Sequence, residues 1–278
     1  MNLAALGLAL SASLSWGLGD FLAGFKSRTL GALGVLVPSQ VFGLVLAVVL
    51  VAARGRGWPG YTVLWAILAA VGGTFGLIAF LRGMSRGSMA VVAPIAGTSA
   101  VVPVVFGIAT GDRLGAATTA GIAAAIVGVV IASREPTPEG AVVAAGAVWG
   151  LLAAVGWGLY FPPLHTAAKV DPYWAVLVFR CTSVTLTAAA LLLLRAPLPS
   201  RRHLPALAAV GVLDVGGNLL FALASAKPGL VSVVSVLASL YPIVTVALAT
   251  IVLRERPAPW QWVGVGLTFA GIGLIAAG

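Results

Sequence analysis

The sequence has little charge, a single cysteine and two histidines. Only 8% of its 278 residues are charged, whereas a soluble domain of this length carries about 25%. The lone Cys181 excludes an internal disulfide and a cysteine-based metal site, and His165 and His203 lie too far apart in sequence for a ligand spacing. We therefore expect no metal and no cofactor in a chain that water does not solvate as a globule.

The charge that is present is mostly basic and scattered. Sixteen Lys and Arg residues against seven Asp and Glu give a formal net charge of +9. These basic residues stand singly between apolar runs, so they form no continuous patch of the kind that binds nucleic acid. Their distribution fits lipid headgroups at the ends of membrane-spanning helices better.

Apolar residues make up 60% of the chain, and the mean hydropathy is +1.10. A bilayer core about 30 Å thick requires about 20 apolar residues per helix, and ten stretches of that kind can be marked. Their approximate ranges are 3–25, 30–53, 61–81, 88–110, 114–132, 141–166, 173–194, 204–226, 230–253 and 260–277. The connections are short, so we expect a multi-pass protein of the lipid bilayer, in the bacterial inner (plasma) membrane, with its function inside the membrane or at its rims.

The two halves of the sequence are similar to each other. The pairs that coincide at an offset of 143 residues include Gly73 and Gly216, Val101 and Val244, Gly121 and Gly264, and Gly128 and Gly271. Nearer the start of each half, an offset of 141 places TrpGly at 16–17 on TrpGly at 157–158. The sequence therefore predicts two five-helix repeats, residues 1–136 and 141–278.

Because five is an odd number, the second repeat enters the membrane from the opposite side. The predicted fold class is thus an all-α membrane protein with ten transmembrane helices in two inverted five-helix repeats. This geometry is typical of transporters, whose substrate site lies near the membrane midplane between the repeats.

Several motifs resemble those of a known family. They are LeuTyrProIleValThrVal at 240–246, GluArg at 255–256, GlnTrpValGly at 261–264 and AlaGlyIleGlyLeuIle at 270–275. These motifs are similar to the signature of the EamA-type transporters of the drug/metabolite transporter superfamily. A weaker copy in the first half has AlaProIle at 93–95 and AspArg at 112–113, with Ser99 and Ala100 in place of TyrPro at 241–242.

The resemblance implies that the third, fourth, eighth and ninth helices border a central cavity. The candidate lining residues on these helices are Phe75, Thr98, Ser99, Asn218, Ser235, Ser239 and Tyr241. The alternative for each hydroxyl is a hydrogen bond to a carbonyl of its own helix or to a neighbouring helix. Relatives export amino acids, drugs, sugars and nucleotide-linked metabolites, so the resemblance leaves the substrate open.

Three ionisable residues lie within the predicted spans. Asp20 lies late in the first, Arg180 in the seventh and Asp214 in the eighth, and an ionisable group at such a position costs at least about 2.5 kcal/mol on insertion scales. A buried carboxylate can bind a proton or a cationic group, whereas Arg180 and Asp214 can instead form a neutralising structural pair. Asp214 and Asn218 are four residues apart and so share one helix face.

Two tryptophans occupy equivalent positions in the repeats. Trp16 and Trp157, with Tyr160 close after the latter, lie deeper than the aromatic belt expected at the headgroups. We expect these rings to gate the cavity or to stack on a substrate.

These features predict a transporter and not an enzyme. We expect a secondary-active or facilitative exporter of a small metabolite, such as an amino acid or an amphipathic compound, which works by alternating access as a monomer or homodimer. No GxxxxGK[ST] motif is present, so ATP is not the energy source, and protons are a candidate coupling ion.

One alternative is an intramembrane aspartyl protease, because GlyLeuGlyAsp at 17–20 matches a GxGD pattern and Asp214 could supply the second carboxylate. Another is a flippase for a lipid-linked metabolite, with an opening toward lipid.

Two arguments about membrane orientation conflict. If the N-terminus is cytoplasmic, most of the loop Lys and Arg residues fall outside, so the positive-inside rule favours both termini outside. The family resemblance implies both termini inside. The sequence leaves this conflict open.

Overall fold

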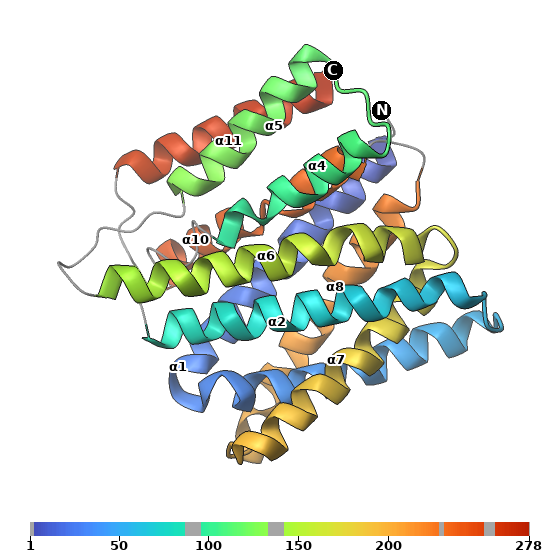
Figure 1. The fold of residues 1–278 in the computed structure, drawn as a ribbon. Coiled ribbons are helices and arrows are strands. Elements are labelled where there is room, and N and C mark those ends of the chain that lie inside the picture. The colour runs from blue at the N-terminus through green and yellow to red at the C-terminus, as the bar shows by residue number, and fades with distance from the viewer. Residues whose placement is uncertain (1–2, 87–95, 133–141, 228–230, 253–258, 278) are drawn as a thin grey trace.

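The computed structural model describes residues 3–86, 96–132, 142–227, 231–252 and 259–277. Within these ranges the chain is helical and contains no strand, which confirms the all-α prediction. The helices lie side by side in a bundle (Figure 1). The motif positions 93–95 and 255–256 and the start of the predicted span at 88–110 lie outside the described residues.

The described helices are mostly long and apolar. Their bounds are α1 Leu3–Arg54, α2 Trp65–Arg86, α4 Val101–Ala109, α5 Ala116–Ala132, α6 Val142–Ala168, α7 Pro172–Leu194, α8 Leu204–Ser225, α9 Val231–Ala238, α10 Tyr241–Val252 and α11 Pro259–Ala277. Short 3-10 turns at Tyr61–Leu64, Thr98–Ala100 and Arg201–His203 precede α2, α4 and α8. By length and composition, five described stretches can each cross a membrane: Leu3–Ser27, Thr29–Arg54, Tyr61–Gly83, Pro172–Leu194 and Arg201–Ser225.

α1 contains the first two predicted spans. Its 52 residues include Gly31, whose φ of 69° lies in the left-handed region, which glycine adopts without strain. The chain turns back at this end of the bundle, so that the two parts of α1 form a hairpin (Figure 1).

The predicted span at 230–253 is interrupted in the structure. α9 ends at Ala238 and α10 begins at Tyr241. Pro242 lies in the first turn of α10, where its missing N–H and fixed φ are tolerated. In the middle of a continuous helix, the same proline would remove a backbone hydrogen bond.

α5 and α11 pack closely through glycine. A Cβ atom on Gly121 would lie 2.7 Å from the carbonyl oxygen of Gly271, and one on Gly128 would lie 2.7 Å from that of Gly264. The contacts advance along α5 while they go back along α11, so the two helices are antiparallel. Small residues permit this approach, as is common between helices in membranes.

The helices of the two halves are interleaved. α1 packs mainly on α8, and α2 packs mainly on α6. The ring of Trp16 covers Gly217 of α8, and the ring of Trp157 covers Gly76 of α2, so a side chain at either glycine would clash with indole. Each half therefore buries its surface against the other half.

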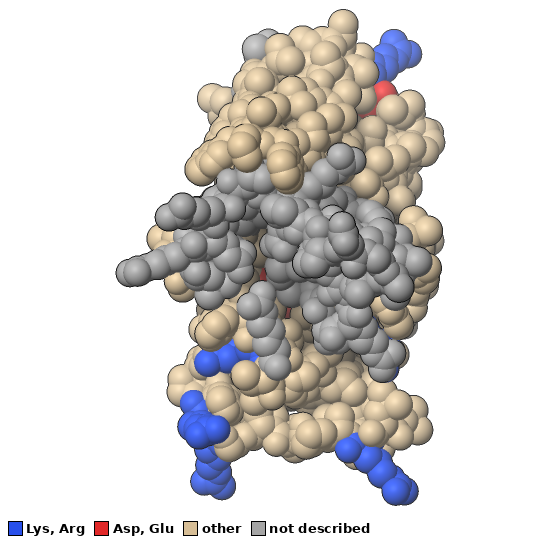
Figure 2. All heavy atoms as spheres, turned by 90° about the vertical axis from the view of Figure 1, so that its left-hand side faces the viewer, with Lys and Arg blue, Asp and Glu red and all other residues tan. Residues whose placement is uncertain are grey.

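Apolar side chains cover most of the outside of the bundle. Leu192, Leu193, Val263 and Phe269 are all exposed. On the face shown in Figure 2, most described atoms belong to uncharged residues, and the visible Lys and Arg side chains lie toward its edges. This is the surface expected of helices that contact lipid and carry charge at their ends.

A polar contact joins α1 to α7 at one end of the bundle. The Asp171 carboxylate caps α7, because it accepts hydrogen bonds from the backbone nitrogens of Tyr173 and Trp174 at 2.9 and 3.1 Å. It also forms an ion pair with Arg54 at 2.8 Å. Pro172 occupies the first helical position, where proline is favoured.

Candidate functional site

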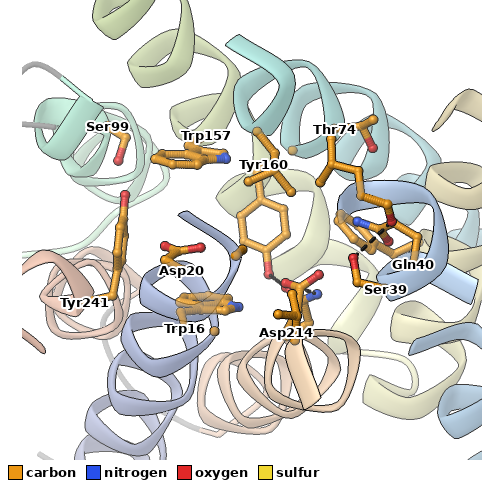
Figure 3. Close-up of a pocket in the computed structure, with 18 of the residues that line it drawn as sticks. Trp16, Asp20, Ser39, Gln40, Thr74, Ser99, Trp157, Tyr160, Asp214 and Tyr241 are labelled. Atoms are coloured by element: carbon orange, nitrogen blue, oxygen red, sulfur yellow. Dashed lines mark hydrogen bonds between the residues drawn. The ribbon is translucent and has the colours of Figure 1, made fainter. Parts of the chain in front are cut away.

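A pocket lies between α1, α2, α6, α8 and α10, with further contributions from Ser99 and Phe179. We call it the central pocket. The space between its lining atoms is about 850 Å³, counting the part that is open to the exterior. Both halves of the chain line it with apolar side chains and a few polar groups (Figure 3).

Most of the predicted site residues line the central pocket. They are Trp16, Asp20, Ser99, Trp157, Tyr160, Asp214, Asn218 and Tyr241. They come from α1, α6, α8, α10 and the turn before α4, so the first and sixth helices contribute together with helices implied by the family resemblance. Asp20, although late in its span, lies in the pocket and not at the rim.

The other predicted site residues do not line the central pocket. Phe75 is 48% exposed and lies on the outer surface of α2. Ser239 is buried and donates a hydrogen bond to the carbonyl of Ser235 at 2.8 Å, which is the helix-internal alternative considered for such hydroxyls. Ser235 is also buried, and Thr98 lies beside Ser99 but outside the lining.

Arg180 is fully buried behind the pocket and is held by two partners. Its Nη2 lies 2.7 Å from Oδ2 of Asp214, and its Nη1 donates a hydrogen bond to Oε1 of Gln40. Removing Asp214 would leave the buried charge of Arg180 without compensation, which is costly in a medium of low dielectric constant. Removing Gln40 would leave a buried N–H without its acceptor. The pairing of Arg180 with Asp214 is thus the neutralising pair that the sequence offered as an alternative.

The ion pair continues into a chain of polar side chains. The Nδ2 of Asn218 lies 3.5 Å from Oδ1 of Asp214, a weak hydrogen bond. The Tyr160 hydroxyl donates to Oδ1 of Asn218 at 2.7 Å. We call Gln40, Arg180, Asp214, Asn218 and Tyr160 the polar chain; it links α1, α7, α8 and α6.

Asp20 has a different environment from Asp214. It lies one helical turn after Trp16, so both side chains project from one face of α1 toward the pocket. No described Lys, Arg or His forms an ion pair with it, since the ion pairs in the described ranges are those of Asp171 and Asp214. Asp20 therefore presents a carboxyl group to the pocket that the described basic side chains do not neutralise.

Four aromatic rings surround this part of the pocket. In Figure 3 the Asp20 carboxyl group lies among Trp16, Trp157, Tyr160 and Tyr241. The ring centroid of Tyr241 is 5.7 Å from that of Trp157 and 6.4 Å from that of Trp16, and Trp16 is 6.0 Å from Tyr160. All three contacts are edge to face, so the rings form walls and not a closed stack.

Two buried hydroxyls in the pocket, those of Ser99 and Tyr241, interact with each other. Ser99 is 1% exposed and Tyr241 is 8% exposed, and the two face each other in Figure 3. Neither Oγ of Ser99 nor the Tyr241 hydroxyl makes a hydrogen bond of normal geometry with any residue in the described part of the chain. Each hydroxyl oxygen keeps lone pairs that a bound ligand or a water can use.

Residues 144–277 match the model of the EamA-like transporter family. The second half of the chain is therefore similar to this family. The family consists of membrane transporters of the drug/metabolite superfamily, and its members are not enzymes. This similarity and the five described stretches that are long and apolar enough to cross a membrane both support an integral multi-pass membrane protein.

A solved structure titled "Crystal structure of protein" is similar to the EamA-like chain over nearly its whole length. It has a TM-score of 0.79, with 99% of this chain and 96% of that chain covered, at 19% sequence identity. A likeness at this identity shows a shared fold and nothing about substrate. The search of curated proteins found no match.

Three polar pocket residues of the EamA-like chain were not predicted. Ser39 and Gln40 follow Pro38 in the second part of α1, and Thr74 lies on α2 and donates a hydrogen bond to Oγ of Ser183 at 3.1 Å. The adjacent Ser39 and Gln40 in an otherwise apolar span were a usable signal. They were passed over because the family resemblance draws attention to other helices.

Proposed function

We propose that the chain is a secondary-active or facilitative carrier, an exporter of a small metabolite, that works by alternating access around the central pocket. The observation that carries this proposal is the pocket itself, because side chains from both halves converge on it. A largely apolar site with a few polar groups between two repeats is where secondary carriers bind substrate.

The contacts of the two tryptophans support a pseudo-symmetry between the two halves of the chain. Trp16 and Trp157 are 141 residues apart, and so are the glycines Gly76 and Gly217 that their rings cover. These contacts therefore favour the offset of 141 for α2 and α8, where the sequence alone aligns Gly73 with Gly216 at 143. If the two halves are exchanged at the offset of 141, the contact of Trp16 with Gly217 becomes the contact of Trp157 with Gly76. This is the relation expected of two repeats that share one arrangement.

The glycine contacts of α5 and α11 support inversion of the repeats. At the offset of 143, Gly121 corresponds to Gly264 and Gly128 corresponds to Gly271. Exchanging the two halves therefore turns the contact of Gly121 with Gly271 into the contact of Gly128 with Gly264. Corresponding helices of two repeats in the same orientation would run parallel, whereas these run antiparallel. α1 begins and α11 ends on the same side of the bundle (Figure 1), as an even number of spans requires.

The protease alternative receives less support from the site. A pair of aspartates that shares a proton needs two carboxyl groups in direct contact. Here Arg180 holds Asp214, and no hydrogen bond joins it to Asp20 in the described ranges. A transport role can use the carboxyl groups of Asp20 and Asp214 without direct contact between them.

Transport by purified protein in proteoliposomes tests the proposal. We expect counterflow of one or more labelled amino acids, amines or sugars through the full chain, measured with and without a pH gradient to separate proton antiport from facilitated diffusion. Trp16→Ala should lower the rate several-fold because it removes a wall of the pocket. Trp262→Ala, an exposed tryptophan of α11 away from the pocket, should leave the rate unchanged. Equal rates in both variants would argue against the central pocket as the substrate site.

A further inference from the structure

We propose that the central pocket selects a singly charged organic cation with an apolar body, and that Asp20 holds its positive charge. The biological meaning of this inference rests on the proposed carrier function, because a carrier's substrate must occupy this pocket. The binding step can nevertheless be measured without transport.

The charge balance of the pocket is the first argument. Asp20 and Asp214 both line it, whereas none of its described lining residues is Lys or Arg. Arg180, buried behind Asp214, compensates that carboxylate. When Asp20 is deprotonated, one negative charge remains without a basic partner among the described lining residues, in surroundings where an uncompensated charge is expensive. A cation of charge +1 restores neutrality, and an anion would add to the repulsion.

The aromatic walls are the second argument. A cation within about 6 Å of the face of Trp or Tyr is attracted by the electron-rich ring, and several rings around one site favour ammonium groups. The Asp20 carboxyl group lies among the rings of Trp16, Trp157 and Tyr241 (Figure 3), and the centroid of Tyr241 is 5.7 Å from that of Trp157 and 6.4 Å from that of Trp16. The same rings tolerate the methylene or aryl part of a ligand, so they suit an amphipathic amine.

The hydroxyls of Ser99 and Tyr241 are the third argument. Oγ of Ser99 and the hydroxyl of Tyr241 are buried in the same pocket as Asp20 without hydrogen bonds of normal geometry to described residues. A hydroxyl oxygen has lone pairs that accept an N–H. A primary or secondary ammonium bound at Asp20 would supply such donors, which a hydrocarbon ligand lacks.

The acidic side of the pocket has no counterpart in the other repeat. With the offset of 141, Asp20 corresponds to Phe161, and Asp214 corresponds to Gly73. The wall made by α1 and α8 is therefore acidic, whereas the wall made by α6 and α2 carries Phe161 and Gly73, and Phe179 of α7 lies near them. This asymmetry orients a ligand with its charge toward α1 and its apolar body toward α6.

The same asymmetry separates amines from amino acids. The carboxylate of an amino acid would enter a pocket with two acidic side chains. The guanidinium of Arg180 is fully buried and already engaged by Asp214 and Gln40. We therefore expect an aryl amine to bind more tightly than the amino acid from which it differs by a carboxylate.

Equilibrium binding to the purified full chain tests this inference. The intrinsic fluorescence of Trp16 and Trp157 reports occupancy, and the probes are benzyltrimethylammonium, its neutral isostere neopentylbenzene, and the pair phenethylamine and phenylalanine. We expect benzyltrimethylammonium to bind at least about tenfold more tightly than neopentylbenzene, and phenethylamine to bind more tightly than phenylalanine. Equal affinity for the charged and neutral isosteres would overturn the inference, and so would preference for phenylalanine.

Two variants assign the charge to Asp20. Asp20→Asn should weaken benzyltrimethylammonium binding at least about tenfold, and Asp20→Glu should retain most of the affinity. Asp171→Asn is the matched control, because it makes the same change outside the pocket and asparagine still caps α7. Unchanged affinity in Asp20→Asn would contradict the assignment. If that variant does not fold, the comparison of the isosteres on the unmodified chain decides alone.

A parallel transport measurement keeps this inference apart from the proposed function. Binding of the cation that depends on Asp20, without any transport, would remove the carrier proposal and leave the site intact. Transport of a neutral or zwitterionic compound, with no preference for cations in binding, would overturn the inference and leave the carrier proposal standing.

Discussion

Arg180 carries a full charge in the interior of a bundle that is otherwise apolar. It is tolerated because Asp214 and Gln40 meet its two terminal nitrogens from two other helices. Buried pairs of this kind contribute little net stability compared with apolar residues, but losing one partner leaves the other unpaired. Together with Gln40, the ion pair of Arg180 and Asp214 connects α1, α7 and α8 next to the pocket.

The first prediction concerns this pair. Arg180→Met should lower the free energy of unfolding by about 3–5 kcal/mol, because Asp214 is left without its counter-charge. The double variant Arg180→Met/Asp214→Leu should recover a large part of the loss. Thermal unfolding of the purified protein in detergent measures both, and a double variant as unstable as the single one would speak against the pairing.

The second prediction concerns the other end of the polar chain. Tyr160→Phe removes the hydroxyl that donates to Asn218, which should cost about 1 kcal/mol of stability. Tyr61→Phe, at an exposed position, serves as the control and should have no effect. The same unfolding assay compares them, and equal midpoints would show that the hydrogen bond does not stabilise the fold.

The site residues that the sequence could identify are those that conflict with their surroundings. Asp20 and Asp214 stand out because a carboxyl group is expensive within an apolar span. Gln40 is uncharged and Phe75 is ordinary in a membrane helix, so neither conflicts with its segment. When every face of a helix is apolar, the sequence does not fix which face turns inward; packing against the neighbouring helices decides it. This is why Gln40 was missed and Phe75 lies on the outside.

α9 depends on a residue from the other half of the chain. The Asp112 carboxylate accepts hydrogen bonds from the backbone nitrogen of Ser232 at 3.1 Å and from its hydroxyl at 2.6 Å. It therefore satisfies a free N–H in the first turn of α9, as a capping side chain does. The helix has only eight residues, so it depends on such contacts and on packing.

The third prediction follows from that cap. Asp112→Ala should destabilise the protein by about 1 kcal/mol, whereas Asp112→Asn should retain most of the stability because an amide oxygen can still accept the hydrogen bonds. Hydrogen exchange of the backbone amides of α9 reports the local effect. Equal exchange rates in the alanine and asparagine variants would contradict the capping role.

The crossing of α5 and α11 gives the fourth prediction. Gly271→Ala should destabilise the fold, because its Cβ would lie 2.6 Å from a backbone nitrogen of α5, that of Ala125. Gly273→Ala lies on the same helix with nothing within 4 Å of the added carbon, so it should be neutral or slightly stabilising. The difference between the two unfolding midpoints is the measurement, and a Gly271→Ala midpoint at or above that of Gly273→Ala would refute the close approach.

Most element boundaries follow from the length of apolar runs. The structure places helices in the predicted spans within a few residues at α2, α5, α6, α7, α8 and α11. The interruption between Ala238 and Tyr241 lies just before Pro242, which is the residue in this stretch that marks a break in the helix. Burial of both short helices against α4 and α1 supplies the stability that an isolated piece of this length lacks.

At the scale of the whole molecule, the two halves form one bundle and not two. The pocket exists because α1 packs on α8 and α2 packs on α6, so that each wall takes helices from both halves. In the proposed carrier mechanism, small movements of one set of helices against the other would open the pocket toward one side and close it toward the other. The internal repeat pointed to this arrangement, but not to the acidic asymmetry of the two walls.

Accessibility of the pocket from the two sides of the membrane tests this account most directly. Ser39→Cys places a thiol of similar size in the pocket lining, and Cys181→Ser removes the only other cysteine. In vesicles of known orientation, we expect a small membrane-impermeant thiol reagent to modify Cys at position 39 when it is added from either side. Modification from one side only, under every condition in which the protein transports, would contradict a pocket that opens to each compartment in turn.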